Sequence, residues 1–155
     1  MTMKALFFPK LEQSTLDKRI STALLALRVI IGIAMVAHGA SKIAAPFSWM
    51  GPDAPVPGLF QALAALAEFG GGIALVIGLL TPLASLGLIS TMIVAVNFHL
   101  SKGDGFVGGY ELAAVYLFAS IAILLAGPGR YSLDFALATV RSRGIIVRDE
   151  VDRRV

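Results

Sequence analysis

The stretch that decides the fold is ISTALLALRVIIGIAMVAHGA, residues 20–40, which contains a single Asp, Glu, Lys or Arg residue, Arg28. As a helix rising about 1.5 Å per residue, this run is long enough to span a bilayer core of roughly 30 Å. A span must be helical, because lipid cannot satisfy backbone N–H and C=O groups. No small-residue cleavage site with a soluble domain behind it follows the run, so we interpret it as a signal anchor.

Three further apolar segments follow, at about 59–80, 83–100 and 109–126. Only Thr81-Pro82 separates the second span from the third, which predicts a tight hairpin between them. The composition agrees, because 57% of the 155 residues are hydrophobic, 15% are charged and the mean hydropathy is +0.82. The sequence therefore predicts an all-α integral membrane protein with four spans, and it argues against a soluble globular domain or a disordered chain.

The positive charges gather in the two terminal segments. Of the 13 Lys and Arg residues, only Arg28, Lys42 and Lys102 lie between residues 20 and 129. Because Lys and Arg are enriched in the cytoplasmic parts of membrane proteins, we expect both termini in the cytoplasm and the loops 42–58 and 101–108 on the other side. Basic tails can also indicate nucleic-acid binding, but membrane topology explains them more simply. The expected partner is the lipid bilayer, and no nucleic acid is expected.

After the fourth span, the Gly-Pro-Gly of residues 127–129 is expected to end the helix. Ser132 is placed to cap a short helix over 133–140, whose apolar and basic residues suit the cytoplasmic membrane interface. The expected organisation is a cytoplasmic N-terminal segment (1–19), a membrane domain (20–136) and a basic cytoplasmic tail (137–155).

Two charged residues are expected deep in the membrane. Each ionisable group at the centre of a span costs about 2.5–3.5 kcal/mol, so such groups usually have partners. Arg28 and Glu68 lie near the middles of two antiparallel spans, which predicts an intramembrane ion pair between them. The pair is interpreted either as a staple that fixes helix register or as a proton or ligand site. The nearby glycines 70–72 predict close helix packing, with a ligand that approaches bare backbone as the alternative.

A second set of polar residues is expected near the outer face of the membrane. Its members belong to three spans and are His38, Lys42, Asn97, His99, Tyr110 and Glu111. They form either a shared ligand pocket or a chance gathering of polar helix ends. Two histidines with Glu111 could mimic a metal site, and the histidines could ligate haem, but neither has a diagnostic spacing, so no metal site is predicted. A quinone headgroup fits better, because it needs hydrogen-bond donors, an apolar slot and a group that exchanges protons.

Cysteine is absent from this chain. The chain alone therefore cannot build a disulfide, a thiolate nucleophile or an iron–sulfur site. A redox role would need a bound cofactor, a quinone or a partner protein.

Taken together, these motifs resemble the DoxX family of small bacterial membrane proteins over about residues 20–136. The residues that carry the resemblance are Arg28, Gly32 and His38-Gly39-Ala-Ser-Lys42, then Glu68, Gly71, Gly72 and Gly78-Leu-Leu-Thr-Pro82, and finally Glu111 and the stretch 127–134. The resemblance implies a four-helix bundle in the bacterial cytoplasmic membrane. It also implies a link to quinone-dependent oxidation, since relatives include the membrane subunit of a thiosulfate–quinone oxidoreductase.

Three function classes remain open at this point. The first is a membrane subunit of a quinone-linked oxidoreductase system that binds a quinone or anchors a redox partner. The second is a non-catalytic scaffold that recruits a soluble enzyme, and the third is a protein that binds or transports a small molecule or lipid. A soluble redox protein and a second copy of the chain are the candidate partners. With so little mass outside the membrane, a complete catalytic apparatus is not expected in this chain.

Overall fold

The computed structural model describes residues 13–141, and this part of the chain is helical with no strand. Four of its helices are long and apolar enough to cross a membrane. The helices are α2 (Gln13–Ile43), α3 (Gly58–Ile77), α4 (Thr81–Ser101) and α5 (Glu111–Ala126), with a short helix over 133–141 after them. The all-α fold with four spans and a short C-terminal helix is thus confirmed.

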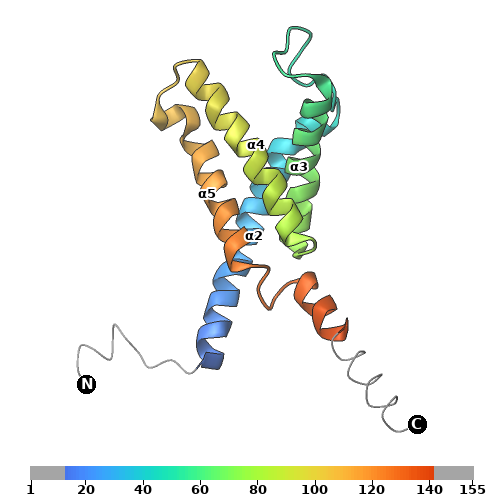
Figure 1. The fold of residues 1–155 in the computed structure, drawn as a ribbon, viewed down its shortest axis with the longest axis vertical. Coiled ribbons are helices and arrows are strands. Elements are labelled where there is room, and N and C mark those ends of the chain that lie inside the picture. Colours follow the sequence, from blue (N-terminus) through green and yellow to red (C-terminus); the bar gives the residue numbers. More distant parts are fainter. Residues whose placement is uncertain (1–12, 142–155) are drawn as a thin grey trace, which may run out of the picture.

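The helices form two antiparallel pairs, α2 with α3 and α4 with α5, which are joined through α3 and α4 (Figure 1). The pairs lie close together at one end, here called the terminal end, where α2 begins and α5 finishes. They diverge toward the loop end, which carries the segments 44–57 and 102–110 (Figure 1). The second of these includes η1 (Phe106–Tyr110), a kinked turn with non-helical backbone angles at Val107 and Gly108 that leads into α5.

The first helix begins at Gln13, well before the expected Ile20. Hydropathy marks only the apolar part of a helix, whereas the backbone hydrogen bonds of α2 continue through the exposed polar residues Asp17, Lys18 and Arg19. The first turns of α2 therefore extend past the other helices at the terminal end (Figure 1). The predicted basic tail lies, from residue 142 onward, outside the described residues.

Glycines let α2 and α3 approach each other closely. A Cβ atom placed on Gly32 would lie 2.6 Å from the carbonyl oxygen of Gly72, and one on Gly72 would lie 2.7 Å from the carbonyl oxygen of Gly32. A Cβ atom on Gly39 would likewise lie 2.5 Å from the backbone nitrogen of Phe69. The close packing predicted for the Gly70–Gly72 run is confirmed for Gly72, and these contacts fix the register of the two helices.

A tight turn joins α3 to α4, as the sequence predicts. Gly78 ends α3 with φ +71°, and its N–H donates to the carbonyls of Ala74 and Leu75. Pro82 lies in the first turn of α4, where its missing N–H costs no helical hydrogen bond.

The segment after α5 is tied to this turn. Ser132 Oγ accepts a hydrogen bond from the Phe135 N–H at 3.1 Å, which confirms Ser132 as the cap of the short helix. The Asp134 carboxylate accepts hydrogen bonds from the N–H groups of Leu80 and Thr81, both at 2.8 Å. A carboxylate from the end of the chain thereby caps the N-terminus of α4 and holds the short helix against the bundle.

Candidate functional site

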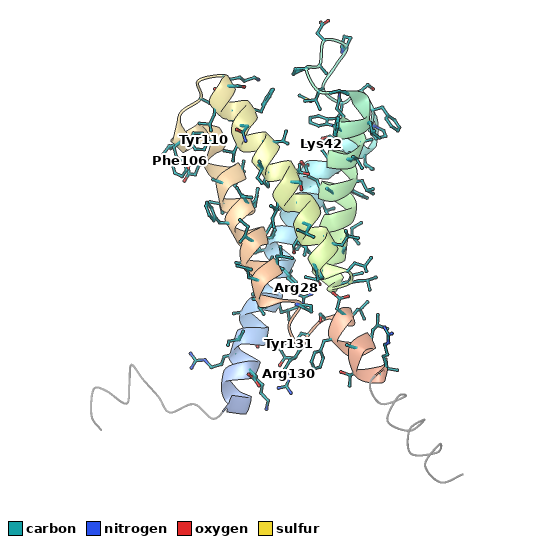
Figure 2. All side chains as sticks on the ribbon, viewed as in Figure 1. Arg28, Lys42, Phe106, Tyr110, Arg130 and Tyr131 are labelled. Atoms are coloured by element: carbon teal, nitrogen blue, oxygen red, sulfur yellow. The ribbon has the colours of Figure 1, made fainter. Side chains whose placement is uncertain are left out.

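The predicted ion pair between Arg28 and Glu68 is wrong. Glu68 is paired with Lys42, whose Nζ lies 2.6 Å from both carboxylate oxygens. Arg28 instead donates hydrogen bonds to the backbone carbonyls of Leu75 and Tyr131. Figure 2 shows Arg28 near Tyr131 toward the terminal end and Lys42 nearer the loop end.

The register of α2 against α3 explains the exchange of partners. Gly32 packs on Gly72 and Gly39 packs on Phe69, so the residue of α2 that faces Glu68 is near Lys42. Arg28 falls beside the end of α3, where a Cβ atom on Gly78 would collide with its guanidinium. The prediction assumed that apolar midpoints share a depth, and this fails because the contact of Gly32 with Gly72 places Arg28, four residues earlier on α2, well past the middle of α3.

Arg28 belongs to the contacts that tie the segment after α5 to the α3–α4 turn at the terminal end, here called the clasp. Its side chain is fully buried, and the two acceptors named above are main-chain carbonyls. Asp134 is the negative charge that acts on it. Partial burial raises the pKa of Asp134, but the N–H groups of Thr81 and Leu80 and the charge of Arg28 outweigh this and hold that pKa below its ordinary value.

The Lys42–Glu68 pair is a different kind of site. The Glu68 side chain is 3% exposed and that of Lys42 is 21% exposed. The Lys42 ammonium also lies 4.7 Å from the centre of the Trp49 ring, a cation–π contact. Both members of the pair line a cavity, so the charges are held at its wall and are not sealed in the core.

The cavity has a volume of about 970 Å³ and lies between α3 and α4, with the 44–57 segment at its loop end. Apolar side chains supply most of its wall, among them Leu63, Ala67, Ala84 and Val94. Gln61 fixes the neighbouring segment: its carbonyl accepts from Trp49 Nε1 at 3.0 Å, and its side chain donates to the Val56 carbonyl at 2.8 Å. The result is a largely apolar space with one buried ion pair on its wall.

His99 lines the same cavity near the loop end. Its Nδ1 lies 2.7 Å from Asp104 Oδ2, and the two side chains are 37% and 40% exposed. Gly87 of α4 lies against Ala67, beside Glu68, and His99 is twelve residues further along α4. At about 1.5 Å per residue, His99 is therefore about 18 Å from the level of Glu68.

The predicted outer cluster is only partly assembled. Lys42 and His99 share the cavity, whereas the other four residues do not line it. His38 is exposed and meets the edge of the Tyr116 ring, and Asn97 donates to the Ile93 carbonyl of its own helix. Tyr110 contacts Phe106, and Glu111 is exposed at the start of α5.

Some residues of the site were not predicted as part of it. Trp49 and Gln61 line the cavity, and Asp134 completes the clasp around Arg28. Trp49 is recognisable in the sequence as an aromatic residue in a loop beside a span, but this pattern predicts only a position at the membrane interface. Nothing in the spacing of the sequence connects Asp134 with the α3–α4 turn.

The comparisons with known proteins agree with this architecture. The family model described as DoxX matches residues 23–101, which is half of the chain and includes Lys42, Glu68 and His99. The "Inner membrane protein YqjF" of Escherichia coli (strain K12) is 34% identical over 85 residues, covering 51% of this chain and 62% of that protein. The chain thus matches less than two thirds of this relative's length. No solved structure matches. The four apolar helices and this relative support a multi-pass protein of a bacterial inner membrane, and the chain belongs to the DoxX family.

Proposed function

We propose that the chain is a membrane subunit of a quinone-linked oxidoreductase system and that the cavity between α3 and α4 binds the quinone ring beside Lys42 and Glu68. One observation carries the proposal: a buried ion pair lies on the wall of an otherwise largely apolar cavity. Because desolvation offsets much of the attraction between buried charges, a role in joining α2 to α3 accounts poorly for this pair, whereas its position on the wall leaves both charges within reach of a ligand.

The donors and acceptors of the pair fit a quinone. A lysine ammonium has three protons, and two suffice for the contacts with the Glu68 oxygens. The third can donate to a quinone carbonyl, and the remaining lone pairs of Glu68 can accept from a hydroxyl of the reduced ring. When bound, the quinone would supply the two-electron chemistry that no side chain of this chain provides.

The walls of the cavity favour a ligand that is dissolved in the membrane. Leu63, Leu83 and Val94 line it and also have exposed fractions of 52%, 65% and 58%. In a bilayer, these side chains face lipid, so a molecule could enter sideways between α3 and α4. At the loop end, the half-exposed His99–Asp104 pair is placed to exchange protons between the mouth of the cavity and water.

The test uses Trp49, the only tryptophan of the chain, which lines the cavity. The purified protein in lipid nanodiscs is titrated with a soluble-chain quinone analogue, and saturable quenching of Trp49 fluorescence reports binding. The double variant Lys42→Met/Glu68→Gln removes both charges together and should weaken binding about tenfold or more, the equivalent of one good hydrogen bond to a charged group. The matched control is Lys102→Met, which should leave affinity unchanged. Equal affinity in the wild type and the double variant would overturn the proposal.

The terminal end favours a second candidate function, the anchoring of a soluble redox protein. Exposed basic side chains lie at this end on the first turns of α2, after α5 and at the end of the short helix, namely Lys18, Arg19, Arg130 and Arg141. A partner with an acidic surface would be attracted to them, and its association would weaken with salt. Cross-linking of a purified acidic redox protein to this end, lost in Arg130→Glu/Arg141→Glu, would support this role. The cytoplasmic location of both termini and the formation of a homo-oligomer stay predictions.

A further inference from the structure

The cavity is longer than a quinone ring requires. Its volume of about 970 Å³ is at the upper end of the roughly 300–1,000 Å³ typical of small-molecule sites. It follows α3 from Gln61 to Ala74 and α4 from its cap residue Leu80 to His99. The stretch of α4 alone extends about 28 Å at the usual helical rise. A ring beside Lys42 and Glu68 would therefore fill only part of it.

The Lys42–Glu68 pair separates two regions of different character. Toward the loop end, the wall includes polar side chains: Gln61, Ser90, Thr91 and His99. Toward the terminal end, every lining residue is apolar: Gly70, Gly71, Ala74, Leu80, Leu83 and Ala84. We call this second region the apolar groove. It suits a hydrocarbon chain and offers a polar headgroup no side-chain partner.

Gly70 has no packing role between helices, in contrast to Gly72. A Cβ atom on Gly72 would collide with the backbone of α2, so helix contact accounts for that glycine. A Cβ atom on Gly70 would meet only Leu66 Cδ1, at 3.2 Å, the flexible end of a side chain on the same helix. The missing side chain at Gly70 therefore keeps the groove open and does not serve the approach of a neighbouring helix.

We infer that the ligand of this site is a tailed quinone whose hydrocarbon chain lies in the apolar groove, from the Lys42–Glu68 pair toward the α3–α4 turn. The inference rests on the proposed function and adds the class of quinone and the direction of its chain. From the level of Gly87 to Leu80, the groove is about 10 Å long, which accommodates the first part of the hydrocarbon chain of a quinone. Because lipid is as apolar as the groove, the chain gains from close van der Waals contact there and not from leaving water.

The experiment compares two probes in nanodiscs: a benzoquinone ring without a chain, and the same ring with a ten-carbon chain. Concentrations are expressed per lipid, so that partitioning into the bilayer does not contribute, and Trp49 quenching reports binding. In the wild type, the tailed probe should bind about tenfold more tightly than the ring alone, as expected for a packed chain. Gly70→Leu fills the groove and should remove most of this advantage while leaving the affinity for the ring unchanged.

A matched variant and a second groove variant complete the test. Ala64→Leu adds bulk to the same face of α3 on the loop side of the Lys42–Glu68 pair. This variant should still bind the tailed probe more tightly than the ring alone, by the same factor as the wild type. If Gly70→Leu does not fold, Leu83→Phe narrows the groove from α4, keeps Trp49 as the only tryptophan and should have the same effect. Equal affinities of the two probes in the wild type, or an unchanged ratio in the groove variants, would overturn the inference and leave the proposed function standing. Absence of saturable binding of either probe would instead overturn the proposed function.

Discussion

The pairing of Lys42 with Glu68 makes a quantitative prediction about stability. Lys42→Met leaves the Glu68 carboxylate, which is 3% exposed, without its counter-ion. Breaking a fully buried pair costs about 3–5 kcal/mol. Lys42 is 21% exposed, so some solvent reaches the pair, and we expect about 3 kcal/mol, at the low end of this range. Glu68→Gln should cost less, about 1–2 kcal/mol, because the ammonium left behind can turn toward solvent.

The double variant Lys42→Met/Glu68→Gln should be more stable than Lys42→Met alone, because no buried charge is left uncompensated. The expected coupling energy between the two positions is about 2–3 kcal/mol. The free energy of unfolding can be measured in mixed micelles by titration with a denaturing detergent, followed by far-ultraviolet circular dichroism. Lys102→Met is the control, because that side chain is exposed and stacks on Phe98 at 4.1 Å, a contact worth about 0.5 kcal/mol.

A second double-mutant cycle, between Arg28 and Glu68, tests the ion pair that was expected from depth in the membrane alone. Arg28 lies beside Gly78, ten residues from Glu68, so about 15 Å of helix separates the two charges. Arg28→Ala should destabilise strongly, but its effect should add to that of Glu68→Gln within about 0.5 kcal/mol. The reasoning would be refuted if Arg28 and Glu68 were coupled more strongly than Lys42 and Glu68.

Three further predictions follow from other parts of the chain. Asp134→Ala removes the cap from α4 and should lower stability by about 2 kcal/mol. Because folding lowers the pKa of Asp134, this contribution should be complete above about pH 4 and lost as the pH falls through the folded pKa. Unfolding titrations across that range should therefore show a smaller loss of stability in the variant than in the wild type. Gly72→Ala places a methyl group against the backbone of α2 and should cost about 2–3 kcal/mol, whereas Gly105→Ala, with open space around its Cβ position, should be neutral in the same unfolding assay. Reporter fusions at the C-terminus and near Pro55 should lie on opposite sides of the membrane, and finding both on one side would contradict the four-span topology.

The fold follows from the sequence because long apolar runs allow few structures. The runs around 20–40, 59–80, 83–100 and 109–126 each become a helix, and the Thr81-Pro82 hairpin and the Ser132 cap are found as expected. Hydropathy measures the apolar length of a span but not where its helix begins. For that reason the start of α2 and the depth of Arg28 could not be derived from it.

The site is less predictable, because it depends on register between helices. Lys42, Glu68 and His99 are all recognisable as polar residues in apolar spans, but the partner of each is set by which side chains face one another. The glycines at 32, 39 and 72 contain this information, since only they permit the contacts that place Lys42 opposite Glu68. Asp134 could not be predicted, because its role arises from a segment far along the chain that folds back onto the α3–α4 turn.

The most direct test of the central claim is to locate a bound quinone on the chain. A photoreactive quinone is activated in nanodiscs that contain the wild-type protein, and the labelled peptides are identified by mass spectrometry. Binding in the cavity predicts labels on the cavity-facing residues of α3 and α4 and on the Trp49-Met50 segment, suppressed by excess unlabelled quinone and by Lys42→Met/Glu68→Gln. Labels spread over the lipid-facing surface of α5, or labels that excess quinone does not suppress, would contradict the claim.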